Sequence, residues 1–396
     1  MNRTSLWTKD FVLISTANFF LFLSFYILLV TLPVYAINDL QSDNSEAGLL
    51  TTIFLVSAII VRPFAGYWLE RYGKKRIMLI SLIIFAVPTL LYFVPESITG
   101  LLLIRFLHGI GFGMSTTATG AIVADLLPNS RRGEGMGYFV LSTTIAMVIG
   151  PFVGITAINQ WSITILFSIC VIGALVAFFL GSGVRIQTSS KPSALITFQW
   201  KDLFETSAIP ISILGGILGL VYSSILSFVS VYANNLGLME VSSLFFVVYA
   251  VVLLLSRPFT GKIFDLLGEN WIIYPTLLCF ASGMYVLGMV NSSVLFILSA
   301  ALIGLGWGTA SPSFQTIAVQ YAAPTRRGTA TATYLSIFDF GIGVGSFMIG
   351  LAMNHISLGH IYQFCSFIIA ASIILYYFIH GKKVSKKRTL MNKHIV

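Results

Sequence analysis

The chain has 396 residues, of which 57% are hydrophobic and only 9% are charged, and its formal net charge is +9. About a quarter of the residues of a soluble globular domain are charged, so this composition excludes a soluble globule. The apolar runs reach the length of about 20 residues that a bilayer-spanning helix requires. The first run is too long for a signal-peptide core and lacks a small-residue cleavage site, so we expect a retained helix.

Twelve apolar runs predict twelve transmembrane helices, six in each half of the chain. They cover residues 12–36, 44–68, 76–95, 97–124, 133–157, 160–184, 208–234, 241–266, 272–291, 293–321, 328–355 and 358–381. We expect an N-terminal six-helix bundle at residues 1–184 and a C-terminal one at 208–381. A polar cytoplasmic linker at 185–207 joins them, and a short basic tail follows at 382–396.

The 23 Lys and Arg residues lie on one side of this topology or inside a helix. The charged residues of the loops on the opposite side are all acidic, namely Asp39, Asp43, Glu46, Glu96 and Glu240. By the positive-inside rule, we expect a multi-pass protein of the cell membrane with both termini in the cytoplasm. The positive charge therefore indicates topology, and we expect membrane lipids but no nucleic acid as partners.

The chain is an internal duplication with a displacement of 195 residues. RPFAGYWLERYGKKR at residues 62–76 recurs as RPFTGKIFDLLGEN at 257–270, and Glu70 corresponds to Asp265. Further pairs keep the same displacement, including Gly109, Gly111 and Gly113 with Gly304, Gly306 and Gly308, and Arg131 and Arg132 with Arg326 and Arg327. So many matches at one offset indicate two copies of one unit.

GYWLERYGKKR resembles motif A of the major facilitator superfamily, with Glu70 where that motif usually has Asp. The second copy keeps Gly261, Asp265 and Gly268 but has Leu266 in place of the motif's Arg. The resemblance implies an all-α membrane fold of twelve helices in two six-helix bundles related by pseudo-two-fold symmetry. It also implies a cytoplasmic gate, for which the candidate residues are Arg62, Gly66, Glu70, Arg71, Gly73, Lys74, Arg257, Gly261 and Asp265.

Two further segments resemble motifs of the same family. Arg105 and Gly109 fit its motif B, with His108 where Gln is usual. Gly150, Pro151 and Gly154 fit its motif C, which marks the antiporter branch, while Ala146 and Ile155 depart from it. This similarity implies drug:proton antiport. The alternative is that the second segment is only a kinked packing helix.

Arg105 and Asp339 lie well inside apolar spans. A charge at the bilayer centre costs about 2.5–3.5 kcal/mol on insertion scales, so each indicates a partner, a wet cavity or a function. We predict that Asp339, kept dry by Phe338 and Phe340, is the proton-coupling residue. The alternative is a structural Asp beside Gly341, Gly343 and Gly345. Further substrate or coupling candidates are Arg105, His108, Asn18, Tyr26, Tyr222, Trp307 and Gln315.

The charged residues of the two motif A copies, Glu70, Asp265, Arg62 and Arg257, are expected at cytoplasmic helix ends. There they have three possible partners: each other, Asp125, or exposed helix termini. Such contacts would serve gating and assembly, and none of them would take part in a chemical reaction.

No Walker A pattern, nucleophile constellation or metal-ligand spacing is present in the sequence, and Cys170, Cys279 and Cys365 read as packing residues. We therefore expect no enzyme, no metal and no cofactor, with the proton gradient as energy source. The leading interpretation is a monomeric secondary transporter that exports small amphipathic or lipophilic compounds by alternating access. One alternative is an exporter of a single metabolite, such as a metallophore, sugar or amino-acid derivative. Another is a lipid-handling or sensory membrane protein of the same fold.

Overall fold

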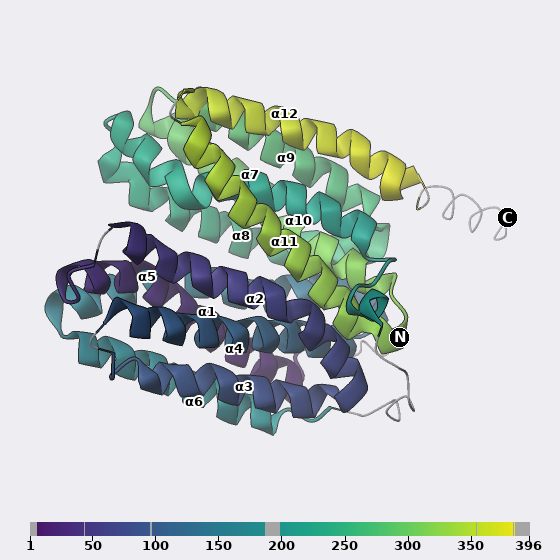
Figure 1. Cartoon of the computed structure of the whole chain (residues 1–396). Helices are drawn as coiled ribbons and strands as arrows, with labels where there is room; N and C mark the ends of the chain where they lie inside the picture. The colour runs from purple at the N-terminus through teal and green to yellow at the C-terminus, as the bar shows by residue number, and fades with distance from the viewer. Residues whose placement is uncertain are drawn as a thin grey trace, which may run out of the picture. The chain divides into compact units, whose positions relative to one another are not determined.

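The computed structural model describes residues 6–42, 44–95, 97–186, 199–353, 355–382 and 384, and the regular structure in them is helical throughout (Figure 1). The long helices of the first half are α1 (Lys9–Asn38), α2 (Asn44–Tyr72), α3 (Lys74–Leu91), α4 (Ile98–Leu126), α5 (Arg132–Gln160) and α6 (Ile163–Gly183). Those of the second half are α7 (Ile209–Asn235), α8 (Met239–Leu267), α9 (Asn270–Gly288), α10 (Ser293–Gln320), α11 (Arg327–Ala352) and α12 (Leu358–Tyr376).

Eleven helices of the described residues are long and apolar enough to cross a membrane, as judged by length and composition. The predicted all-α, multi-pass membrane fold is therefore confirmed. Helix α3 is not among the eleven, because its 18 residues begin with the cations Lys74, Lys75 and Arg76. The twelfth span stays a prediction.

Helices α2 and α8 are longer than the sequence predicts. Each continues through an internal proline, Pro63 and Pro258, and ends at Tyr72 and Leu267. Our expectation that Arg62 and Arg257 lie at helix ends is therefore wrong, because each lies about three turns before the last helical residue. Their side chains are 2% and 3% exposed.

Contacts within the chain define two compact units, of which the first holds residues 1–128, 139–205 and 322–336. Within it, α4 packs against α2 and α3, and α6 packs against α1 and α3. Glycines make these approaches possible. A Cβ added at Gly109 would lie 2.3 Å from the carbonyl oxygen of Phe54 on α2, and one at Gly111 would lie 2.5 Å from the backbone of Phe85 on α3.

The second unit holds residues 129–138, 206–321 and 337–396. Within it, α10 packs against α8 and α9, and α12 packs against α7 and α9. A Cβ at Gly304 would lie 2.7 Å from the carbonyl oxygen of Tyr249 on α8, and one at Gly306 would lie 2.4 Å from the backbone nitrogen of Phe280 on α9. The duplicated glycines thus make equivalent contacts in the two units.

Helices α5 and α11 each belong to both units. The start of α5 lies in the second unit and its remainder in the first, whereas the start of α11 lies in the first unit and its remainder in the second. The sequence predicts bundle boundaries at residues 184 and 208, which would assign each of these helices to one half. These boundaries stay a prediction. Residues 187–198 of the predicted linker and nearly all of the predicted tail lie outside the described residues.

Candidate functional site

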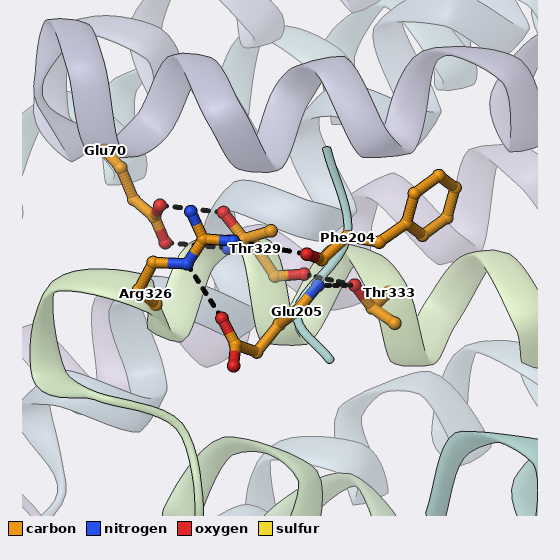
Figure 2. Close-up of polar contacts among 6 residues, drawn as sticks. All are labelled: Glu70, Phe204, Glu205, Arg326, Thr329 and Thr333. Carbon is orange, nitrogen blue, oxygen red and sulfur yellow. Dashed lines mark hydrogen bonds and ion pairs between the residues drawn. The ribbon is translucent and has the colours of Figure 1, made fainter. Parts of the chain in front are cut away.

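Glu70, in the last turn of α2, caps the start of α11 inside the first unit (Figure 2). Its carboxylate accepts hydrogen bonds from the backbone N–H of Thr329 at 2.9 Å and from the hydroxyl of Thr329 at 2.7 Å. The first N–H groups of a helix have no partner within the helix, and the helix dipole favours a negative charge there. Of the three partners left open by the sequence, Glu70 therefore takes an exposed helix terminus.

Asp265 makes the corresponding cap inside the second unit. Its carboxylate accepts from the backbone N–H groups of Gly133 at 2.8 Å and Glu134 at 3.0 Å, at the start of α5. Gly261, one turn earlier on α8, permits this approach, because a Cβ there would lie 2.5 Å from Cα of Glu134. Both acids of the duplicated motif thus hold the first turn of a helix.

The structure explains why glycine occupies positions 66 and 73 of the first motif copy. A Cβ added at Gly66 would lie 2.6 Å from Cβ of Ala332, so α2 and the start of α11 need a glycine to meet. Gly73 joins α2 to α3 with φ of 92°, in the left-handed region that favours glycine. The guanidinium of Arg71 donates to the hydroxyl of Tyr67.

A second carboxylate reaches the start of α11 from the segment that precedes α7 (Figure 2). Glu205 accepts from Nε of Arg326 at 2.7 Å, and its backbone N–H donates to the hydroxyl of Thr333 at 2.9 Å. Arg326 also donates to the carbonyl oxygen of Phe204 at 3.2 Å. The sequence predicts only a linker for this segment, and no motif marks Glu205.

Asp125, at the end of α4, binds two cations in the same region. Lys74 at the start of α3 forms an ion pair with it, and Nη1 of Arg327 donates to its Oδ1 at 3.1 Å. Lys74 is thus placed with the first turn of α11, as its assignment to a gate requires. Its role in gating stays a prediction.

Arg62 ties α2 to α4 inside the first unit. Its Nη1 donates to the hydroxyl of Thr116 at 2.8 Å and Thr117 at 3.3 Å, and to the carbonyl oxygen of Gly113 at 3.4 Å. Arg257 occupies the duplicated position on α8, yet its Nε and Nη2 have no hydrogen-bond partner among the described residues. The two buried arginines therefore differ in how they are satisfied.

Arg105 and His108 form one buried cluster in the first unit, and both are fully buried. Nε of Arg105 donates to the carbonyl oxygen of Leu50 at 3.2 Å, and its guanidinium lies 4.2 Å from the ring centroid of Phe54. The hydroxyl of Tyr92 lies 3.0 Å from Nδ1 of His108 and 3.5 Å from Nη1 of Arg105. The two side chains thus share one face of α4, and Tyr92 is the partner that sequence reasoning missed.

Tyr222 and Trp307 come together in the second unit. Their rings stack with centroids 4.1 Å apart and planes 13° apart, and Trp307 also stacks on Phe338 of α11 at 5.7 Å. The hydroxyl of Tyr222 donates to that of Tyr249 at 3.3 Å. The stack therefore combines aromatic side chains from α7, α10 and α11.

Asp339 follows Phe338 on α11 and is partly buried. Phe340 is 61% exposed, and the expectation that Phe338 and Phe340 keep Asp339 dry stays a prediction. A Cβ at Gly343, one turn on, would meet nothing within 4 Å. The helix is continuous through the glycines that follow Asp339, so no helix end is there for it to cap.

Asn18 and Tyr26 on α1 pack helices of the first unit together. Nδ2 of Asn18 donates to the hydroxyls of Ser142 at 3.0 Å and Thr143 at 3.2 Å, and its Oδ1 accepts from the hydroxyl of Thr119 at 3.0 Å. These bonds join α1 to α4 and α5. Asn18 thus uses both polar atoms of its side-chain amide to join three helices.

The motif C glycines serve the same packing. A Cβ at Gly150 would lie 2.5 Å from Cβ of Tyr26, and one at Gly154 would lie 2.9 Å from Cγ2 of Thr31. Helix α5 continues through Pro151. Gln315 lies buried on α10 of the second unit.

A surface pocket of about 430 Å³ lies at one end of the second unit, lined by residues that include Tyr232, His360 and Gln363. None of the sequence-predicted site residues lines it. The described residues contain no group of three or more His, Cys, Asp or Glu side chains placed to hold a metal.

The family model of the Major Facilitator Superfamily matches residues 14–346 and 239–392. The chain belongs to this superfamily, whose members are transporters and not enzymes, and the predicted family is thereby confirmed.

Relatives in sequence include exporters. The chain is 25% identical to an uncharacterised MFS-type transporter of Methanocaldococcus jannaschii over 87% of its length and 92% of the relative's. It is 23% identical to the staphylopine export protein of Staphylococcus aureus over 85% of its length and 88% of the relative's. It is 32% identical to the quinolone resistance protein NorA of Staphylococcus aureus, over only 34% of its length and 35% of the relative's.

Solved structures share the fold. The human organic anion transporter MFSD10 superposes with a TM-score of 0.81 at 15% identity, over 93% of this chain and 98% of that one. The proton:xylose symporter XylE superposes with a TM-score of 0.75 at 12% identity, over 93% of this chain and 94% of that one. At these identities the similarity shows the fold alone.

Proposed function

We propose that this transporter exports small amphipathic compounds by alternating access, in exchange for protons. The observation that carries the proposal is Asp339, a partly buried carboxylate that directly follows Phe338, a member of the stack with Tyr222 and Trp307. An aromatic stack suits flat apolar ligands, and a carboxylate inside an apolar span suits a residue that takes up and releases a proton. The relatives named for quinolone resistance and staphylopine export support efflux as the direction.

The helix caps are the contacts that we expect to change during transport. Glu70 and Glu205 hold the start of α11, and Asp265 holds the start of α5. Each of these helices continues into the other unit. Breaking and remaking the caps would therefore change how the starts of α5 and α11 are held, and such contacts bias a conformational change by about 1–3 kcal/mol.

The proposal also includes the location, the oligomeric state, the orientation and the energy source of the protein. The protein works in the cell membrane as a monomer surrounded by lipid, with both termini in the cytoplasm. It needs no cofactor, because the proton gradient supplies the energy.

The second candidate is export of one metabolite. It is favoured by coverage, because the staphylopine export protein aligns with 85% of this chain and NorA with only 34%. The two candidates share the mechanism and differ only in the breadth of substrates.

Reconstituted vesicles test the proposal. The purified full-length protein is placed in vesicles with an imposed proton gradient, and internal pH is followed as lipophilic drugs and candidate metabolites are added. We expect proton movement on addition of transported compounds and an altered resistance or metabolite-efflux profile in a deletion strain. Vesicles in which no compound moves protons, together with an unchanged deletion strain, would support the lipid-handling or sensory alternative instead.

A further inference from the structure

Arg257 is a buried cation with unsatisfied hydrogen-bond donors. Its side chain is 3% exposed, and neither Nε nor Nη2 has a partner within the described part of the chain. The hydroxyl of Thr260, less than one turn further along α8, is likewise buried and unpaired among those residues. A buried charge without a partner costs several kcal/mol, so an acceptor is needed at this position.

The duplicated copy shows how such an arginine is satisfied by the protein itself. Arg62 donates to the hydroxyls of Thr116 and Thr117 on α4. At the displacement of 195 residues, these threonines correspond to Ser311 and Pro312 on α10. Proline has no hydroxyl, so the acceptor that Thr117 supplies is absent from the second copy.

The helices that carry these residues meet in the same register in both copies. A Cβ at Gly113 would lie 2.6 Å from the carbonyl oxygen of Ala58 on α2. A Cβ at Gly308, its counterpart, would lie 2.7 Å from Leu253 on α8. Helices α8 and α10 thus meet in the register of α2 and α4, while Pro312 takes the place of one acceptor, Thr117.

Gly137, near the start of α5, lies close to the Arg257 side chain. A Cβ there would lie 3.3 Å from Cδ and 3.4 Å from Nη1 of Arg257. Any larger residue would press on the guanidinium.

The aromatic stack lies further along the same helix pair. Tyr249 lies about two turns before Arg257 on α8. Its hydroxyl accepts a hydrogen bond from Tyr222, which stacks on Trp307. Eight residues of α8 separate Tyr249 from Arg257, which corresponds to about 12 Å along the helix.

We propose that Arg257 and Thr260 form an anion subsite that binds the carboxylate of an amphipathic substrate whose aromatic part lies against Tyr222 and Trp307. A guanidinium binds a carboxylate through two parallel hydrogen bonds, which matches its two free donors. This inference rests on the proposed transport function and narrows its substrate class to amphipathic carboxylates.

Binding to a matched pair of probes tests the subsite. Radiolabelled 1-naphthaleneacetate and 1-naphthaleneacetamide share the ring system and differ in charge. Both are titrated against the purified full-length protein in uncharged detergent, so that no lipid phosphate competes. We expect tighter binding of the carboxylate by wild type, and a loss of at least tenfold in its affinity in Arg257→Gln. Affinity for the amide should change less than twofold.

Two further variants keep the test interpretable. Arg257→Lys retains the charge without the planar fork, and we expect it to bind the carboxylate between three- and tenfold more weakly than wild type. Thr260→Val removes only the hydroxyl and should weaken the carboxylate by a few-fold. Unchanged thermal unfolding and unchanged amide binding verify that each variant is folded.

Equal affinity of wild type for the two probes would overturn the subsite, as would unchanged carboxylate binding in Arg257→Gln. Loss of both probes together in a folded Arg257→Gln would also overturn it. The proposed function fails separately, because binding needs no proton gradient. A charge-dependent loss of binding in a protein that moves no protons would contradict the transport proposal alone.

Discussion

Glu70 and Asp265 cap equivalent helix starts with different hydrogen bonds. Glu70 accepts from the backbone and hydroxyl of Thr329, whereas Asp265 accepts only from backbone N–H groups. The position equivalent to Thr329 is Glu134, whose own carboxylate is bonded to Arg131 at 2.8 Å. Glu134 repels Asp265 while Arg131 attracts it, whereas Arg326 and Lys74 both attract Glu70, so the charges around the Glu70 cap are the more favourable.

Glu70→Gln should shift the protein towards its inward-open state. The substitution removes the charge from a helix cap, which is worth about 0.5–2 kcal/mol, while leaving the shape of the side chain. We expect the inward-open population to rise several-fold with little change in folding, as measured by spin-label distances at the cytoplasmic helix ends. Asp265→Asn is the matched control and should shift the population less. An unchanged distance distribution in Glu70→Gln would end the gating hypothesis.

Asp339→Asn should uncouple transport from protons. Asn keeps the size and much of the hydrogen bonding of Asp but cannot release a proton. We expect normal expression, retained substrate binding and loss of accumulation against a gradient, measured by substrate uptake into vesicles. A variant that still concentrates substrate with wild-type pH dependence would assign Asp339 a structural role.

Arg105→Lys should reduce transport about tenfold or more, and Arg105→Ala should abolish it. A lysine has no Nε to donate to Leu50 and no flat group to lie on Phe54. His108→Gln is the control, because Nε2 of His108 has no partner among the described residues, and we expect transport within about twofold of wild type. Full transport by Arg105→Lys would reduce its role to that of a positive charge.

Asn18→Leu should destabilise the first unit. The substitution removes three hydrogen bonds that join α1 to α4 and α5, each worth about 0.6 kcal/mol in membrane proteins, so we expect a loss of about 2 kcal/mol. Unfolding in mixed micelles measures it. Ser168→Ala is the control, because that hydroxyl bonds only within its own helix, to the carbonyl oxygen of Thr164. Equal stability of the two variants would show that Asn18 does not hold the helices.

Cysteine labelling tests the orientation. In a variant with Cys170, Cys279 and Cys365 replaced by alanine, Ser42→Cys and Leu238→Cys should react with an impermeant maleimide added outside intact cells. Lys201→Cys should react only after the membrane is opened, because cytoplasmic loops carry the basic residues. Reaction of residue 42 or 238 from the cytoplasmic side would reverse the topology.

Some site contacts could be predicted and others could not. The acids of the duplicated motif were assigned to helix termini as one of three possibilities, and the structure selects that one for Glu70 and Asp265. Arg105 and His108 stand three residues apart, and residues three apart in a helix are neighbours, so their common cluster is readable from the sequence. Tyr92 and Glu205 carried no signal, since their partners lie on other helices and no motif includes them.

The sequence by itself determined the membrane location, the duplication and the superfamily. Apolar length, loop charge and a repeated motif are local properties, and each is readable without knowing which helices touch. Only the tertiary structure decided that Arg62 is satisfied and Arg257 is not, although the two stand in the same motif. A hydrogen-bond partner depends on which residue a neighbouring helix presents at the same level, and a single proline at residue 312 removes one such acceptor.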